Sequence, residues 1–378
     1  MANNSDLFNC CSGQEDLLAG YGSNKCLAGK DNGKFSQANT FSKLYVFGDS
    51  LSDSGNLFNA TTYVQSFEEF LEVDIPVIPP SPPYFEGRFS NGPVWVENLA
   101  EDLGLTLTPS TELSVFNPQF RLPSPVTFTP EGIEISPFFN GTTTTQSVNF
   151  AFGGAQTGER NAGELAGFRP GVLTQVDWFV NDHQQVELAD SDALYIVWAG
   201  ANDYQNIPDA QPEEIVGNLK TAIESLYDIG ARNFLVPNLP DLGKTPLALS
   251  SASLVPADTL TNLTREHNLL LDTTLDDLRD SLTGINPIPF NVNGIFNEIL
   301  TTPEEFGLTG RTSPALRGRG QPLTNVSEPC LDPVTFVGCS NPDEYLFWDA
   351  IHPTSFAHEI LGEFALTTLI TETETILI

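Results

Sequence analysis

The sequence predicts an α/β protein, a three-layer α/β/α sandwich built on a five-stranded, mainly parallel sheet. Short apolar runs rich in β-branched and aromatic residues alternate along the chain with longer segments in which apolar residues recur at helical spacing. The run that precedes Gly200 is apolar at every position, as expected for a strand that is buried on both faces. Strands that alternate with helices form parallel sheets with helices on both sides, because each parallel connection must cross the sheet.

The individual elements follow from the same periodicities. Strands are predicted at residues 43–47, 147–152, 193–198, 233–236 and 287–290. Helices are predicted at residues 93–103, 172–188, 212–229, 257–282 and 354–370. Three long segments lack either pattern: prolines in 60–92 predict a surface loop, 104–146 predicts turns with a short hairpin and a possible lid, and 331–347 predicts irregular structure.

The chain divides into a polar leader and one large domain. Residues 1–40 are glycine-rich, and two nine-residue segments within them, 16–24 and 25–33, share the tripeptide Leu-Ala-Gly. These two copies resemble, in degenerate form, the calcium-binding nonapeptides of RTX proteins, but most of the expected aspartates are replaced. This favours a loosely packed leader over a calcium site. Residues 41–372 are predicted to form a single domain around the sheet.

The composition excludes several kinds of binding partner. Sixteen Lys and Arg residues against 49 Asp and Glu residues give a formal net charge of -33, which repels nucleic acid and anionic membrane surfaces. No run approaches the roughly 18 apolar residues of a transmembrane segment, and the first residues lack the pattern of a signal peptide. We expect a monomer that is secreted, as acidic proteins often are, with a cytoplasmic location as the alternative. The cysteines have no companion histidines at zinc-like spacing, so no metal site is expected.

A serine follows the first predicted strand. Residues 46–56 read V-F-G-D-S-L-S-D-S-G-N, which places Ser50 in the turn that leaves the strand. The carboxyl ends of parallel strands are where ligands bind in open sheets. The same letters are also typical of a plain turn in which Ser52 and Asp53 cap a helix, so the motif alone does not settle a function.

Four motifs in order nevertheless resemble those of the GDSL (SGNH) hydrolases. The block around Ser50 is followed by N-F-A-F-G-G-A-Q at residues 149–156, G-A-N-D at 200–203 and D-A-I-H-P at 349–353. The resemblance extends over roughly residues 43–370 and is strongest to the bacterial lipase, esterase and phospholipase branch. It implies the flavodoxin-like SGNH hydrolase fold.

The resemblance also implies a role for each matching residue. Ser50 would be the nucleophile, His352 the base and Asp349 the acid of a catalytic triad. The backbone amides of Ser50 and Gly154 and the side chain of Asn202 would form the oxyanion hole. Considered singly, these residues have simpler explanations: a strand-end turn for the glycines, a tight turn for Asn202 and a helix cap for the Asp-x-x-His pair.

Two further groups of residues are candidates. The aromatic segment 84–93 predicts a substrate-facing rim with Arg88 and Asn91, although loop packing explains these residues equally well. His183 and His267 fall inside predicted helices and are expected to be partly exposed. Cys330 and Cys339 bracket a segment with turn-forming Pro333 and Gly338, which favours a disulfide just before the Asp349–His352 loop and supports secretion.

The predicted function is hydrolysis of small-molecule or lipid carboxylic esters, of lipase, esterase or phospholipase type, through an acyl-enzyme on Ser50 and without a metal or organic cofactor. The acyl chain length and the alcohol are not determined by the sequence. An α/β-hydrolase is disfavoured because Ser52 stands where that class has glycine. The alternative function is not enzymatic: the chain would be a binding or surface protein on the same scaffold.

Overall fold

The computed structural model describes residues 41–66, 76–113, 126–129, 132–135, 137, 139–159, 170–184, 188–207, 209–306, 308 and 325–376. The leader, with its two repeats and three cysteines, lies outside these residues, so the predictions for it stay predictions. Six strands form a single sheet in the order β2-β5-β1-β6-β7-β8, and every pairing within it is parallel. The α/β prediction is therefore confirmed, and the predicted count of five strands is wrong.

The five predicted strands are present as β1 (Leu44–Gly48), β5 (Ser147–Asn149), β6 (Leu194–Trp198), β7 (Asn233–Pro237) and β8 (Asn286–Phe290). The additional strand is β2 (Leu107–Pro109), three residues that pair with β5 at the sheet edge. It is too short to show an alternating pattern, and its proline suits only an edge strand. The hairpin expected between residues 104 and 146 is present as β3 (Val126–Thr129) and β4 (Gly132–Ile135), which pair antiparallel.

Side-chain alternation along β1 divides the core into two layers. Leu44 and Val46 pack into one buried cluster, and Tyr45 and Phe47 into another on the opposite face. All five residues of β1 and all five of β6 are buried, which accounts for the continuous apolar runs in the sequence. The sheet is consequently covered on both sides.

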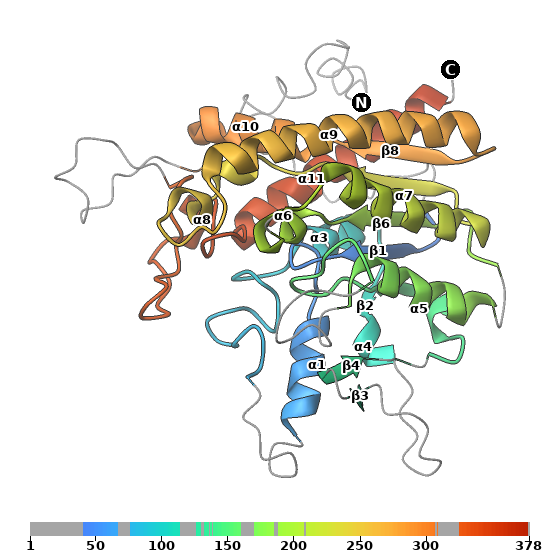
Figure 1. Cartoon of the computed structure of the whole chain (residues 1–378), viewed down its shortest axis with the longest axis horizontal. Helices are drawn as coiled ribbons and strands as arrows, with labels where there is room; N and C mark the ends of the chain where they lie inside the picture. Colours follow the sequence, from blue (N-terminus) through green and yellow to red (C-terminus); the bar gives the residue numbers. More distant parts are fainter. Residues whose placement is uncertain are drawn as a thin grey trace, which may run out of the picture.

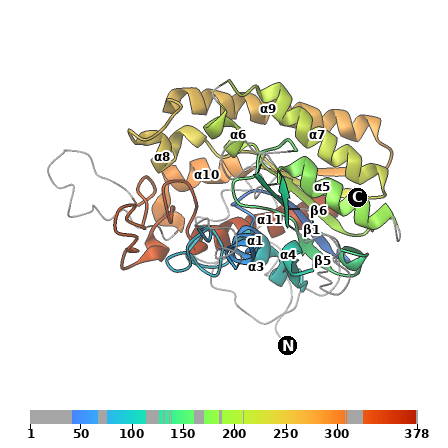
Figure 2. The ribbon, with the colours of Figure 1, turned by 60° about the horizontal axis from the view of Figure 1, so that its bottom comes forward.

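Helices form the outer layers (Figures 1 and 2). One face of the sheet packs against α5 (Val172–Gln184), α7 (Pro212–Asp228) and most of α9 (Ala257–Ser281). The other face packs against α3 (Trp95–Asp102), α10 (Val292–Thr301) and α11 (Ser355–Ile376). The remaining helices are short or peripheral: α1 (Asn56–Gln65), α4 (Ser110–Leu113), α6 (Ala201–Asn206) and α8 (Pro246–Leu249).

Helix α1 corrects the loop predicted at residues 60–92. Ala60, Thr61 and Val64 are buried on the inner side of this helix, so its last six residues are helical and packed. The proline cluster that predicted a loop lies farther along, and the described residues 76–92 form neither helix nor strand. The prolines begin only at Pro76, so the loop prediction should not have been extended back over the end of α1.

The order of the strands places one crevice at the end of β1. The chain proceeds from β1 to β2 and β5 on one side and then returns to β6 on the other, so β1 has later strands as both neighbours. The carboxyl ends at such a reversal leave an opening between the loops that depart in opposite directions. Among the described residues, no helix is both long enough and apolar enough to span a membrane.

Candidate active site

Ser50 lies two residues beyond β1, at the crevice. The strand is locked at its end because Gly48 exchanges hydrogen bonds with the side-chain amide of Gln175, whose Oε1 accepts from the Gly48 N–H at 2.9 Å and whose Nε2 donates to the Gly48 carbonyl at 2.9 Å. Asp49 and Ser50 are both buried. The backbone that carries the serine is therefore fixed on both sides of the turn.

A buried polar network holds the segment after Ser50 against the second motif. The Asp53 carboxylate accepts four backbone N–H bonds: from Gly55, Asn56 and Leu57 at the start of α1, and from Gly153 at 2.8 Å. The N-cap position of α1 is Gly55, so Asp53 binds the first N–H groups of the helix from two residues before the cap, and the same carboxylate also anchors the glycine segment. Asn56 and Asn149 connect the two motifs further, since the Asn56 amide donates to the Asn149 and Ala151 carbonyls.

The triad residues come together although 302 residues separate the serine from the histidine. Ser50 Oγ lies 2.8 Å from His352 Nε2, and His352 Nδ1 lies 2.7 Å from Asp349 Oδ2. A carboxylate can only accept, so the Nδ1 proton points to Asp349 and leaves Nε2 free to accept the serine proton. Asp349 Oδ1 accepts from the backbone N–H groups of Ile351 and His352, each at 2.8 Å, which folds the loop around the carboxylate.

Electrostatics keep Asp349 ionised. Burial by itself would raise the pKa of this carboxyl, but the charge of His352 and the hydrogen bonds from His352 and Tyr84 lower the pKa to about 2. The Tyr84 hydroxyl donates to Asp349 Oδ2 at 2.7 Å, and burial together with the Asp349 charge raises the pKa of Tyr84, so it stays a donor. A charged acid that is fully hydrogen-bonded is what the imidazole needs as a partner.

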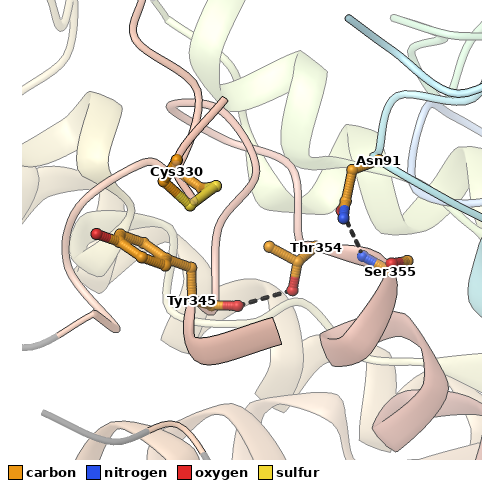
Figure 3. The surroundings of a disulfide bond; sticks show 6 residues. Asn91, Cys330, Tyr345, Thr354 and Ser355 are labelled. Carbon is orange, nitrogen blue, oxygen red and sulfur yellow. Dashed lines mark hydrogen bonds between the residues drawn. A yellow bond between two sulfur atoms is a disulfide. The ribbon is translucent and has the colours of Figure 1, made fainter. Parts of the chain in front are cut away.

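The loop that carries Asp349 and His352 has little regular structure and is held by contacts from elsewhere. The predicted disulfide between Cys330 and Cys339 is confirmed and closes the preceding segment into a hairpin. Backbone bonds join this hairpin to the loop, from Cys330 N–H to the Phe347 carbonyl and from Leu331 N–H to the Trp348 carbonyl. Figure 3 shows two further supports, the 2.7 Å bond from Thr354 Oγ1 to the Tyr345 carbonyl and the 2.9 Å bond from Ser355 N–H to Asn91 Oδ1.

The three residues predicted to form the oxyanion hole line one cavity together with His352. Gly154 has a φ of 78°, which favours glycine, and a Cβ on the adjacent Gly153 would lie 2.1 Å from the ring of Phe89. The side chain of Asn202 donates to the Ala155 carbonyl at 3.0 Å and to Asp49 Oδ2 at 3.4 Å. Both glycines are thus required by local geometry as well as by the predicted role.

The cavity beside Ser50 has a volume of about 400 Å³ and is mostly apolar. Its walls come from α6, α8, α9, α10 and α11 and from the chain between α8 and α9, including Leu247, Leu254, Ile295, Ile299, Ile360 and Leu361. Cavities of this size are typical of small-molecule sites, where a few polar groups orient a largely apolar ligand. The cavity was not predicted from the sequence, because α10, which supplies Ile295 and Ile299 to its wall, was not predicted.

The carboxyl group next to Ser50 differs from Asp349. Burial raises the pKa of Asp49 to about 7, against the lowering effects of the Leu51 N–H and His352. Burial likewise raises the pKa of Asp53 to about 6 and that of Asp203 to about 6. These groups accept hydrogen bonds mainly from amides and hydroxyls, and no cation is bonded to them.

The two candidate rim residues make structural contacts. Arg88 forms an ion pair with Glu97 at 2.6 Å, and Asn91 caps the first turn of α11. Neither is among the residues that line the cavity. Two aromatic residues of the same segment do reach the triad: Tyr84 through its bond to Asp349, and Phe89, whose ring centroid lies 5.0 Å from that of His352.

The other histidines are buried, and the predicted partial exposure of His183 and His267 is wrong. Each lies on the inner side of its helix, a position that their polar character concealed in the sequence. Burial lowers the pKa of His267 to about 3 and that of His358 to about 3, so both are neutral. His358 Nδ1 accepts from the Trp95 N–H, which uses a neutral ring as a helix-to-helix link.

Some residues that position the site were not predicted from the sequence, because they are not among the residues to which the four motifs assign a catalytic role. Gln175 fixes the end of β1, and Asn149 donates from its side chain to the Ser52 carbonyl and the Ser54 hydroxyl. A signal was present for both, since Asn149 ends β5 and Gln175 lies in the first turn of α5, each next to apolar residues of the core. Tyr84 belongs to the segment predicted as a substrate-facing rim, but its bond to Asp349 was not predicted.

Comparisons with known proteins show the family to which the chain belongs. The family model described as GDSL-like Lipase/Acylhydrolase matches residues 44–365. Among curated proteins, the phosphatidylcholine-sterol acyltransferase of Aeromonas hydrophila is 26% identical over 362 residues, covering 86% of this chain and 90% of that relative. A GDSL esterase/lipase of Arabidopsis thaliana is 28% identical, covering 85% and 87%, and a GDSL lipase of Tanacetum cinerariifolium is 28% identical, covering 85% and 82%.

Proposed function

Because the chain belongs to the GDSL-like lipase/acylhydrolase family and is thereby an ester-hydrolysing enzyme, we propose that Ser50 is its nucleophile and that its substrates are lipid esters with a long acyl chain. One observation carries the proposal: the hydrogen-bonded pair of Ser50 and His352 borders a cavity whose other walls are mostly apolar. The reactive pair and a compartment for hydrocarbon are thus adjacent.

The first half-reaction begins at the Ser50 hydroxyl. His352 Nε2 accepts the hydroxyl proton as Oγ bonds to the ester carbonyl carbon, and the carbonyl electrons move to the oxygen. The oxygen's electrons then return, the bond to the alcohol breaks, and His352 donates its proton to the departing alcohol. The acyl group remains on Ser50. Asp349, with a pKa of about 2, stays charged throughout and stabilises the imidazolium that exists between the two proton transfers.

In the second half-reaction, water replaces the alcohol. His352 accepts a proton from water as its oxygen attacks the acyl-enzyme, and returns that proton to Ser50 Oγ when the acid leaves. Both steps pass through a negatively charged oxygen. We assign its donors to the Ser50 and Gly154 amides and the Asn202 side chain, where the substrate oxygen would replace the long 3.4 Å contact between Asn202 and Asp49.

The apolar walls support the choice of a long acyl chain. Hydrocarbon transferred from water to such a cavity gains roughly 0.8 kcal/mol for each buried CH₂ group. Acetyl esters would leave most of the cavity unused. The Aeromonas relative, whose name joins a phospholipid to a sterol, is consistent with lipid acyl groups as the transferred unit.

The nucleophile is tested with a fluorophosphonate probe and peptide mapping. We expect the label on Ser50 and no turnover of p-nitrophenyl esters by Ser50→Ala. Ser253→Ala is the matched control, because Ser253 lines the same cavity but its hydroxyl donates to the Val255 carbonyl, and this variant should retain activity and labelling. Labelling of another serine would refute the assignment, and absence of turnover by the wild type would favour a non-catalytic binding protein.

The acyl group is tested with p-nitrophenyl esters of graded length. The value of kcat/KM should rise from acetyl to long acyl, and Ile295→Trp, which fills the cavity, should reduce turnover of long esters more than of acetate. A maximum at acetate would contradict the lipid assignment while leaving Ser50 as the nucleophile. Hydrolysis and acyl transfer to an alcohol both release p-nitrophenol first. Adding a sterol to the assay and measuring sterol ester therefore distinguishes the two reactions.

We also propose an extracellular location, which the disulfide supports because such bonds persist in oxidising compartments. Alkylation of the protein in intact cells and in culture medium, followed by mass mapping of Cys330 and Cys339, is the measurement. Recovery of the protein only from the cytoplasm, with both thiols reduced, would contradict it.

A further inference from the structure

Exposed apolar side chains gather on two segments next to the cavity. Ten large apolar residues are exposed among those that the structure describes, and single cases of this kind are ordinary. Half of them, however, belong to the end of α8 with the loop after it and to the tip of the disulfide hairpin. These five are Leu249, Leu254, Val334, Phe336 and Val337.

Both segments are attached to the loop that carries Asp349 and His352. The Leu247 N–H donates to the Ala350 carbonyl at 2.8 Å, and the Leu331 N–H donates to the Trp348 carbonyl at 2.7 Å. Leu254, which is 87% exposed, also lines the cavity. In Figures 1 and 2 the chain around α8 and the red segment that precedes α11 lie at the same end of the molecule. One segment therefore lines the cavity through Leu254, and the other is bonded to the loop whose His352 lines the same cavity.

The hairpin tip is built to present its apolar side chains. The disulfide closes its base, and Asp332 Oδ1 accepts from the N–H groups of Val334 and Thr335. Phe336 has a φ of 54°, a left-handed conformation that asparagine or glycine adopts more readily than a bulky residue, and the residue is 52% exposed. An aromatic residue held half-exposed in an unfavourable backbone conformation points to contact with something outside the chain.

Charge restricts what that contact can be. Residues 245–255 and 325–340 contain no Lys or Arg, and the whole chain carries a formal charge of -33. An anionic surface would be repelled, and an acidic peptide would find no cation to pair with. A zwitterionic phospholipid layer has no net charge and offers hydrocarbon directly below its headgroups, where apolar side chains on loops can insert.

We propose that these two segments form a docking surface for zwitterionic phospholipid layers, with the cavity entrance facing the lipid. Docking would let an acyl chain pass from the layer into the cavity without crossing water. The binding itself requires no chemistry at Ser50, so it extends beyond the proposed function and can fail or succeed independently.

The test is co-sedimentation of the full chain with phosphatidylcholine vesicles. Phe336→Asn should reduce the vesicle-bound fraction several-fold without loss of thermal stability, because asparagine tolerates the backbone conformation and removes only the ring. A variant with Val334→Ser, Phe336→Asn and Leu249→Ser, none of which lines the cavity, should weaken partitioning at least about tenfold. The matched control is Leu188→Ser with Leu269→Ser, two exposed leucines outside both segments, which should bind as the wild type does.

Turnover separates docking from catalysis. The triple variant should hydrolyse a water-soluble p-nitrophenyl ester at the wild-type rate and lose turnover only on vesicles. Replacing half of the phosphatidylcholine with phosphatidylglycerol should weaken binding of the wild type. Unchanged binding by the triple variant, equal loss in the control pair, or tighter binding to the anionic vesicles would each overturn the proposal.

Discussion

The two sides of the triad are built differently. Ser50 follows a strand whose residues are all buried, and the segment after it is tied down by side chains that belong to the sheet and its helices. Asp349 and His352 lie on a loop, and residues 325–348 before it contain no strand or long helix; the loop is held by a disulfide hairpin and by Tyr84 from a distant loop. Regular structure positions the proposed nucleophile, and several long-range contacts position the proposed base.

The pKa values of the carboxyl groups also differ between the two sides. Asp49 and Asp53 on the nucleophile side are buried without a charged hydrogen-bond partner, and burial raises the pKa of each, to about 7 and about 6. Burial acts on Asp349 as well, yet its pKa falls to about 2 because His352 and Tyr84 compensate. Burial alone therefore does not determine the charge of an aspartate at this site, since its hydrogen-bond partners decide the direction of the shift.

The largest effect is expected from Asp349→Asn. An amide in place of Oδ2 would donate to His352 Nδ1, which forces the remaining proton onto Nε2, facing Ser50, where it cannot accept. Turnover should fall on the order of 10⁴-fold with little change in KM. Asp343→Asn, an exposed aspartate on the same segment, should be neutral. Wild-type turnover in Asp349→Asn would show that another group orients the histidine.

A smaller effect is expected from Asn202→Ala on the opposite side of Ser50. Loss of one oxyanion donor should lower kcat roughly 10²- to 10³-fold and leave KM nearly unchanged, because the donor matters most when the negative charge forms. Asn206→Ala on the same helix α6 is the control, since its exposed amide donates only to the Asn202 carbonyl. If Asn202→Ala lowers the melting temperature but not the rate per folded molecule, the residue is structural.

The opposite pKa shifts predict opposite effects of pH on stability. The pKa of Asp53 is raised from 3.8 to about 6. Its contribution to the free energy of unfolding is therefore complete below pH 4 and is lost as pH rises through 6. The pKa of Asp349 is lowered from 3.8 to about 2, so its contribution is present above pH 4 and is lost as pH falls toward 2. Each change amounts to about 2 to 3 kcal/mol.

Denaturant unfolding of wild type, Asp53→Asn and Asp349→Asn between pH 2 and 7 measures these contributions. The difference in the free energy of unfolding between the wild type and Asp53→Asn should decrease above pH 4. The corresponding difference between the wild type and Asp349→Asn should decrease below pH 4. Parallel curves for all three proteins would mean that neither carboxyl changes its pKa on folding.

The comparison also explains what the sequence could predict. Five of the six sheet strands and the helices α3, α5, α7, α9 and α11 follow apolar periodicities, and the four motifs lie at their ends. Strand β2 was missed because it has only three residues, and helix α10 was missed although its buried residues Val292, Ile295, Phe296 and Ile299 recur at helical spacing. On the base side, the contact from Tyr84 to Asp349 joins residues 265 apart, and no local pattern encodes such a pairing.

The smallest effect on turnover is expected from Cys330→Ser with Cys339→Ser. Opening a loop of this length should reduce the free energy of unfolding by roughly 2 to 3 kcal/mol. The triad should be affected less, because Asp349 keeps its bonds to Tyr84 and to the backbone of its own loop, none of which involves a sulfur atom. We therefore expect a lower melting temperature with only a few-fold loss of kcat on a soluble ester. A loss comparable to that of Asp349→Asn would instead make the disulfide the main support of the base side, and Tyr84 a secondary one.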